Sequence, residues 1–313
     1  MILKTYNPAD LSEKRTFSKL TSVIFTSRFY RPGSFEIHTE TKGFEINDII
    51  AFKSYGRINS GIIMKIAERD AEYVITGYDL KGVYEMRHIS FPAQYTGTPS
   101  QIMEALATEF LAVDGRALPG ILIEVSEFDG DSIVYTPDKE YLSKSFETFG
   151  FLHEVGTRLD FNLQNIVFSA VKGVDRSQLI KFSRKNRTIE SYELVNDIFN
   201  TYNVGYSTDE NGTETVTGNA TGFLRRECFK DKNIEEYLAE KAEIATLRGE
   251  ANEKYVYGKD YELGDYVTVM TDEVQTVKQI TEVKEVYEHG RSMIIPVFGT
   301  EKENPLKRIL KGE

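Results

Sequence analysis

The sequence predicts an α+β fold that is mainly β, with two related small β-barrel domains and an inserted α/β subdomain. Three observations lead to this prediction. About five short β-type runs fall within roughly sixty residues near the start of the chain, the spacing of a small barrel or sandwich. A stretch near the end repeats the pattern of one near the start, and residues 91–165 alternate between helical and strand patterns. We therefore expect domains at 1–90, 91–165, 166–255 and 256–313.

The predicted repeat relates Phe44–Gly77 to Tyr261–Gly299. Each stretch opens with an aromatic residue, Glu, Ile or Leu, Asn or Gly, and Asp, and each ends in a β-type run that stops at Gly. A short tail with Leu and Lys or Arg follows, at 80–87 and 306–310. We expect one supersecondary unit used twice, so that 256–313 repeats 44–87; the alternative is a chance match between two strand-turn-strand segments.

Turn chemistry is the physical reason to expect this repeat. Asn47-Asp48 and Gly264-Asp265 are dipeptides whose residues tolerate positive φ or bond their own backbone. Each is followed at once by a β-branched or aromatic run, which includes Val267 in the second copy. Both dipeptides should form tight turns that lead into strands.

Residues 1–90 should form the first barrel. In the run 34–38, Phe35 and Ile37 alternate with polar residues, which indicates one buried face. Before it, Arg31-Pro32-Gly33 predicts a turn in which Pro sets φ and Gly supplies the left-handed conformation. The remaining strands are expected at 22–26, 49–52, 61–66, which begins with Gly61, and 73–76.

Residues 91–165 should form the α/β subdomain. Ser100 is a plausible N-cap for a helix to Val113, which Asp114-Gly115 would end. A buried strand is expected at 121–125 and a second helix at 141–155, closed by Gly156.

Residues 166–255 should return to β structure and contribute to the barrels. Strands are expected at 166–171, 179–182 and 203–206, with a turn at Gly173-Val174-Asp175-Arg176 and a hairpin at 209–212. A helix is expected at about 233–248, capped by Asn233. Further on, β-branched residues recur every three positions, which favours a twisted strand pair with bulges over a helix: Val274, Val277, Ile280, Val283 and Val286.

Composition excludes several classes of protein. The 313-residue chain carries 28% charged residues and a net charge of −11, which argues against a sequence reader of DNA. A lumen through which DNA slides without sticking is compatible with this charge. No run approaches the roughly 18 apolar residues of a membrane span, and no signal-peptide core is found. The single cysteine, Cys228, fits folding in a reducing cytoplasm.

A search for catalytic patterns finds little chemistry. The four histidines are far apart and lack the spacing of zinc ligands, and no nucleophile elbow or P-loop occurs. Acidic loops at 129–131 and 209–211 lack the ligand series of a calcium loop. Arg225 and Arg226 precede Cys228 and could lower its pKa, but a buried strand position is the simpler interpretation. We expect no enzyme activity, no cofactor and no metal site.

The order of these turns and strand ends resembles the siphophage tail-associated hub family almost from end to end. The resemblance is carried by Phe29–Ile37, 61–63, 74–80, 87–89, 173–176, 182–183, 225–227, 263–267 and 298–299. The residues singled out as its turn and strand motif are Gly33, Phe35, Asp48, Gly61, Gly77, Gly173, Asp175, Gly264, Asp265, Val267 and Gly299.

This resemblance implies a baseplate or tail-tip hub similar to those of contractile-tail phages and type VI secretion spikes. It implies two related barrels per chain, a homotrimer that matches a hexameric tube ring, and a place in the virion tail between the tail tube or distal tail protein and the tip proteins. A carbohydrate- or receptor-binding module would also be acidic and mainly β, and a lytic cell-wall hydrolase would need a carboxylate pair. Both remain as alternatives.

Overall fold

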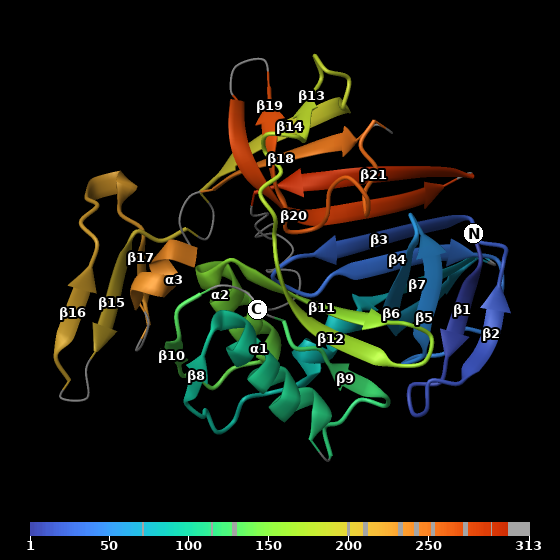
Figure 1. Cartoon of the computed structure of the whole chain (residues 1–313), viewed down its shortest axis with the longest axis horizontal. Helices are drawn as coiled ribbons and strands as arrows, with labels where there is room; N and C mark the ends of the chain where they lie inside the picture. Colours follow the sequence, from blue (N-terminus) through green and yellow to red (C-terminus); the bar gives the residue numbers. More distant parts are fainter. Residues whose placement is uncertain are drawn as a thin grey trace. The chain divides into compact units, whose positions relative to one another are not determined.

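The computed structural model describes residues 1–70, 72–113, 115–126, 130–198, 201–208, 212–230, 234–240, 244–251, 254–271, 275–288 and 290–299. Two compact units are present: a main unit of Met1–Tyr192 with Arg248–Phe298, and a small unit of Glu193–Leu247 with Gly299–Glu313. The fold is mainly β, as predicted (Figure 1). Within the described ranges, no helix has the length and apolarity needed to cross a membrane.

Thirteen strands form one sheet, which contains two sets of strands that we call the first and second β-modules. The first β-module is β1 (Leu3–Tyr6), β2 (Glu13–Phe17), β3 (Ser22–Arg28), β4 (Ser34–Thr39), β5 (Ile49–Ser54), β6 (Arg57–Arg69) and β7 (Glu72–Asp79). The second is β13 (Lys181–Ser183), β14 (Ile189–Asp197), β18 (Ile244–Ala251), β19 (Tyr266–Met270), β20 (Gln275–Glu288) and β21 (Arg291–Phe298).

The two modules repeat one strand arrangement. In the sheet, β3-β4-β7-β6-β5 corresponds to β14-β18-β21-β20-β19, and the chain visits the five strands of each set in the same order. This strand order agrees with the repeat expected from the sequence, and the correspondence takes in β3, β4, β14 and β18, which lie outside the two stretches read from the sequence. The tail expected at 306–310 lies outside the described residues.

Hydrogen bonds reproduce the repeat at atomic detail. The Asn47 N–H donates to the Ile63 carbonyl at 2.9 Å and the Ile63 N–H to the Asp48 carbonyl at 3.0 Å. At positions 217 residues later, Gly264 donates to Ile280 and Ile280 to Asp265, both at 2.8 Å. A β-bulge follows in both copies, between Ile63 and Lys65 and between Ile280 and Glu282. The expected strand with bulges is thus confirmed over 275–288, and Val274 lies outside the described residues.

Apolar side chains pack together in both modules. The core of the first contains side chains from all seven of its strands, among them Leu3, Phe17, Phe25, Phe35, Ile37, Ile50 and Ile75. In the second, Phe182 packs against the rings of Tyr261 and Phe298, with centroids 5.2 and 5.0 Å away.

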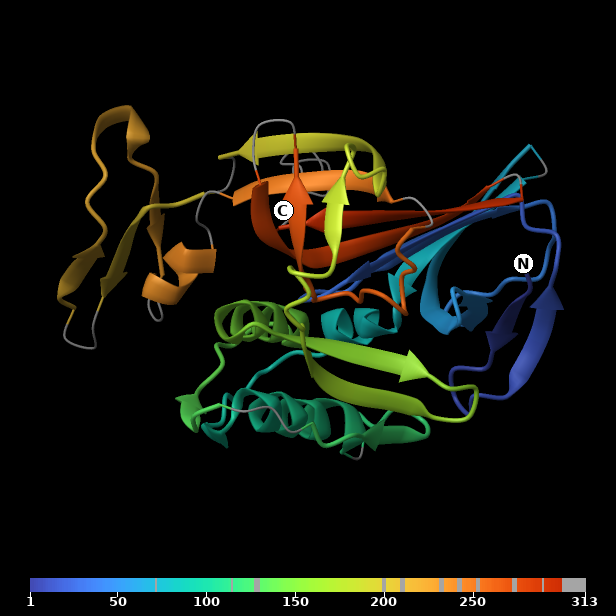
Figure 2. The ribbon, with the colours of Figure 1, turned by 45° about the horizontal axis from the view of Figure 1, so that its top comes forward.

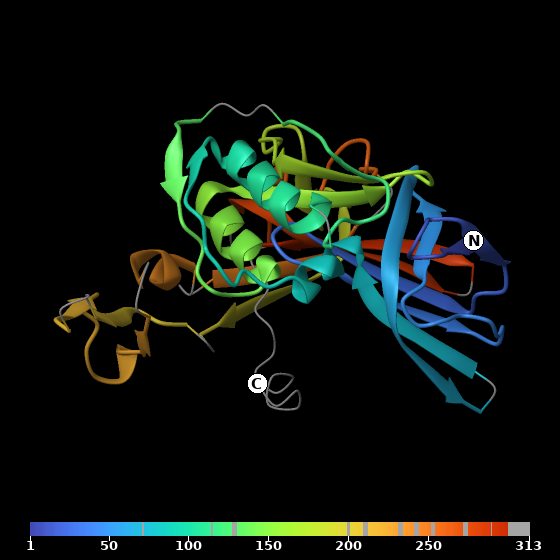
Figure 3. The ribbon, with the colours of Figure 1, turned by 90° about the horizontal axis from the view of Figure 1, so that it is seen from below.

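The inserted subdomain packs two helices on a three-stranded sheet. Its elements are η1 (Leu80–Met86), β8 (Tyr95–Gly97), α1 (Pro99–Ala107), η2 (Thr108–Ala112), β9 (Ile121–Ile123), β10 (Ile133–Tyr135), α2 (Leu142–His153), β11 (Val155–Phe161) and β12 (Ile166–Lys172). α1 and α2 share one apolar core with β11 and β12, and these elements form a layer beneath β20 and β21 (Figures 2 and 3).

Both helix predictions here are confirmed, but their caps differ from expectation. Thr98, not Ser100, caps α1, because its hydroxyl accepts from Gln101 N–H while the Gln101 side chain accepts from Thr98 N–H. At the other helix, Glu154 takes the left-handed conformation after α2, and Gly156 already belongs to β11. The expected stop residue Asp114 lies outside the described residues.

The small unit contains β15 (Val204–Thr208), β16 (Glu214–Thr217), η3 (Gly222–Leu224), β17 (Glu227–Phe229) and α3 (Ile234–Glu240). β15 and β16 pair as the expected hairpin, although 209–211 lie outside the described residues. The helix expected at 233–248 was wrong in its second half, because Ile244–Ala251 forms β18 between β14 and β21. Sheet pairing overrides a weak local preference there. Asn233, its expected cap, lies outside the described residues.

Candidate functional site: the junction of the β-modules

The two β-modules are joined edge to edge. β3 of the first pairs antiparallel with β20 of the second, from Arg28 opposite Glu282 to Ser22 opposite Glu288. One further bond extends this ladder, from the Phe29 N–H to the Thr281 carbonyl at 2.9 Å. The junction is therefore continuous β-sheet, visible in Figure 1 where β3 lies beside β20.

Ion pairs reinforce this junction from three elements. Arg28 on β3 donates through Nε to Glu282 Oε2 at 2.6 Å. Arg57 on β6 and Arg158 on β11 both reach Glu262 Oε2, at 2.5 and 3.3 Å. Because Glu282 is buried and the other partners are partly buried, removing one partner would leave a charge with less than full solvation, which is costly. The pairs therefore hold the two modules and the inserted subdomain in one arrangement.

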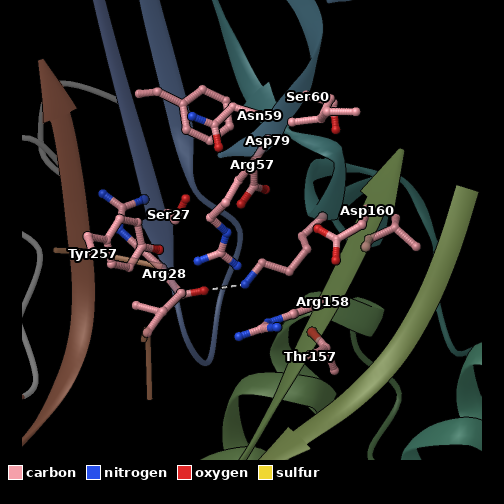
Figure 4. A pocket seen from close by; sticks show the side chains of 15 residues that line it. Ser27, Arg28, Arg57, Asn59, Ser60, Asp79, Thr157, Arg158, Asp160 and Tyr257 are labelled. Carbon is pink, nitrogen blue, oxygen red and sulfur yellow. Dashed lines mark hydrogen bonds between the residues drawn. The ribbon is translucent and has the colours of Figure 1, made fainter. Parts of the chain in front are cut away.

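A polar cavity of about 70 Å³ lies beside these ion pairs (Figure 4). Lys81, only 5% exposed, lies in its wall and donates to the Arg28 carbonyl. Burial lowers the pKa of Lys81 to about 8 and raises the pKa of Asp79 above its usual range. Three buried atoms of the lining have no protein partner: Asp79 Oδ1, Asn59 Nδ2 and Thr157 Oγ1. A polar cavity of this size is large enough for water, whose hydrogen bonds would satisfy them.

The predicted turn aspartates occupy equivalent buried positions. Asp48 and Asp265 are each 2% exposed, and each follows a residue with positive φ, Asn47 at 70° and Gly264 at 99°. Asp48 accepts from Lys14 Nζ at 2.7 Å. Asp265 accepts from Arg176 Nε at 2.6 Å and from the backbone N–H groups of Val174 and Glu262, both at 2.9 Å. The aspartate side chain of this turn thus accepts one hydrogen bond in the first module and three in the second.

Three predicted glycines in the first module act through close packing. A Cβ added to Gly61 or Gly77 would lie within 2.8 Å of the Phe35 ring, so both glycines make room for that side chain. Gly33 was expected in a left-handed conformation, and this was wrong: its φ is not positive, and an added Cβ would overlap the Thr26 carbonyl. Glycine at this position allows the backbone of the turn to approach the Thr26 carbonyl closely.

The remaining predicted residues belong to the second module. The turn at 173–176 lies against Gly264–Tyr266: an added Cβ on Gly173 would overlap the Gly264 carbonyl, and the Arg176 N–H donates to the Tyr266 carbonyl at 2.8 Å. Asp175 is exposed and accepts from the Ser177 N–H at 2.9 Å. Val267 is fully buried in β19, and Gly299 follows β21 with φ 85°. The register places Phe298, not Gly299, at the position of Gly77.

Sequence reasoning missed the charged residues of the junction. Arg28 and Glu282 are 254 positions apart in the chain, and Arg57 and Glu262 are 205 apart, so no local pattern joins them. The repeat indicated Glu262 alone among these residues, because Glu262 is the counterpart of Glu45 in the shared turn motif. Among the described residues, no group of three or more His, Cys, Asp or Glu side chains is placed to hold a metal ion.

The site is therefore a junction at which a β-module is joined to a second module of the same strand order by strand pairing and ion pairs. Comparison with family models adds a specific assignment: residues 6–300 match the Siphovirus ReqiPepy6 Gp37-like proteins, and the chain belongs to that family. A search of curated proteins finds no match.

Solved structures share the fold along nearly the whole chain. The prophage MuSo2 43 kDa tail protein from Shewanella oneidensis matches with a TM-score of 0.59 and 10% identity, covering 95% of this chain and 96% of that one. A tail protein from Neisseria meningitidis MC58 gives 0.59 and 14%, covering 96% of both chains. Prophage tail protein gp18 from Listeria monocytogenes EGD-e gives 0.58 and 12%, covering 99% and 98%. The resemblance to phage tail proteins read from the sequence is confirmed, because the chain shares the fold of these phage and prophage tail proteins.

Proposed function

We propose that this protein is the hub of a phage or prophage tail tip, where three chains form a ring that joins the tail tube to the tip. The observation that carries the proposal is the duplicated module, whose five strands follow one order in both copies. Three chains supply six similar modules, which suits a tube built from hexameric rings. Closed rotational symmetry is the common way in which oligomers form.

The proposed partners are other copies of this chain, the tail tube or distal tail protein on one side, and the tip proteins on the other. The protein would be made in the bacterial cytoplasm and carried in the virion tail. Its net charge of −11 suits a ring through which DNA passes, because like charges do not hold the phosphate backbone. In this role the chain acts by assembly rather than by catalysis.

Deletion and complementation test the proposal. Particles are induced from a prophage that lacks the gene and inspected by electron microscopy, with and without an affinity-tagged wild-type copy supplied in trans. We expect no complete tails without the gene, restored tails with it, and co-purification of the tube protein with the tagged chain. Normal tails in the deletion strain would contradict the hub.

The same strains separate the two alternative functions. Complete tails that no longer adsorb to host cells, together with binding of the purified protein to wall glycans, would indicate a receptor-binding module. A cleared zone in a cell-wall zymogram of the purified protein would indicate a lytic hydrolase.

A further inference from the structure

The two long strands at equivalent positions, β6 and β20, differ in what lies along one edge. The first part of each pairs with the preceding strand, β5 or β19, and the equivalent turns then bond to Ile63 and Ile280. Beyond that point, Glu282–Glu288 of β20 lies between β21 and β3. The counterpart in β6, Lys65–Arg69, pairs with β7 alone among the described residues.

The hydrogen-bond pattern identifies which groups of β6 point to this edge. The Thr281 carbonyl accepts from the Phe29 N–H, so in an antiparallel ladder Val283 and Glu285 also direct their backbone groups to β3. Met64, Ile66 and Glu68 lie 217 positions earlier and follow the equivalent bulge. Their backbone N–H and C=O groups therefore point away from β7, to the outer edge of β6.

Burial follows the same division. Thr281 and Glu285 are 9% and 5% exposed beneath the β3 junction. Their counterparts are open, because Met64 is 40% exposed and Glu68 is exposed. Figure 3 shows the far part of the β6–β7 hairpin extending past the neighbouring strands. An uncovered strand edge of this kind is a ready site for another strand.

The chain also contains the strand that the repeat places opposite this edge. β14 is the counterpart of β3, and it stands at the end of the sheet path. Charge supports the match: Ile189–Asp197 contains Glu190 and Glu193 but no lysine or arginine. The outer part of β6 carries Lys65 where β20 has Glu282, and Arg69 where β20 has Val286. In the β3–β20 junction the basic residue Arg28 lies on β3 and the acidic residue Glu282 on β20. Between their counterparts the signs are reversed, with acidic residues on β14 and basic residues on β6.

We propose that the outer edge of β6 pairs antiparallel with β14 of a second copy, and so repeats between chains the β3–β20 junction found within one chain. Each chain then offers one edge of each kind, and such head-to-tail contacts generate a ring when the rotation closes. The number of chains, three, rests on the proposed function. The edge pairing itself rests on the internal repeat.

A proline tests the pairing with little disturbance of the hairpin. Glu68→Pro removes a backbone N–H that points outward, the strand position at which proline is tolerated. Glu68→Ala is the matched control, since it loses the same carboxylate and its contact with Tyr73 but keeps the N–H. If Glu68→Pro fails to fold by circular dichroism, Ile66→Pro with Ile66→Ala repeats the comparison one outward position earlier.

The readout is the mass of the purified chain by sedimentation over a wide concentration range. We expect wild type and Glu68→Ala to form the same closed oligomer and Glu68→Pro to stay monomeric, with at least a tenfold weaker association. Equal association of Glu68→Pro and Glu68→Ala overturns the edge pairing and leaves the hub role intact. A wild-type chain that stays monomeric also overturns it, whereas the hub role is decided by the tail-assembly experiment.

Discussion

Replacing the two equivalent turn aspartates by alanine should have very different effects on stability. Asp265→Ala removes the acceptor of three hydrogen bonds and leaves the Arg176 guanidinium and two backbone N–H groups without it. Leaving a donor without its acceptor costs about 1–3 kcal/mol, so the loss of all three bonds should cost roughly 3–5 kcal/mol. Asp48→Ala removes one bond to Lys14, whose side chain is 28% exposed and can return to water. We expect its cost to be about 1 kcal/mol.

Each variant is the control for the other, because the surrounding turn has the same backbone hydrogen bonds in both modules. The free energy of unfolding is measured from urea curves followed by circular dichroism at neutral pH. Asp175→Ala adds a second control, since the exposed Asp175 carboxylate accepts a hydrogen bond from the N–H of Ser177, which is close by in the chain. Equal losses for Asp265→Ala and Asp48→Ala would refute the reasoning that the number of buried acceptor bonds sets the cost.

Three further predictions concern packing, pH and the junction. Gly77→Ala should lower the free energy of unfolding by roughly 1–3 kcal/mol, because the new methyl would overlap the Ile62 carbonyl and press on Phe35. Gly130→Ala should be neutral in the same urea assay, because an added Cβ there meets only Pro99, at an ordinary contact distance of 3.6 Å. Burial lowers the pKa of Lys81 in the folded protein to about 8, below its value in the unfolded chain. The free-energy cost of burying its charge is therefore fully present below pH 8, and it decreases as the pH rises toward the unfolded pKa. The free energy of unfolding of wild type should therefore rise by up to about 3 kcal/mol over this range relative to that of Lys81→Met. Parallel curves of stability against pH for the two proteins would contradict this. Glu282→Gln leaves Arg28 facing a neutral amide and should lower the free energy of unfolding by about 1–3 kcal/mol. Glu13→Gln, in an exposed ion pair, should cost less, and a thermal melt of both variants checks this order.

Local chemistry was enough to predict the mainly β fold, both helices of the inserted subdomain and the repeat. Asn47-Asp48 and Gly264-Asp265 could be recognised because a residue that accepts positive φ, followed by aspartate and a β-branched run, acts over a few positions. Prediction was wrong where non-local pairing decided the outcome. Residues 244–248 have a helical pattern, yet they form β18 because β14 and β21 offer backbone partners on both sides. Gly33 was placed in the correct turn but for the wrong reason. The Thr26 carbonyl next to it leaves no room for a Cβ, and a local sequence pattern does not show this tertiary contact.

The sequence by itself determined that a β-module occurs twice, because turn residues and strand periodicity are written in neighbouring positions. Only the tertiary structure decided how the two copies meet. The β3–β20 ladder, the pairing of Arg57 and Arg158 with Glu262, and the bond from Lys81 to the Arg28 carbonyl join residues far apart in the chain. Strand edges and charges find partners by position in space, and a linear pattern does not contain that information.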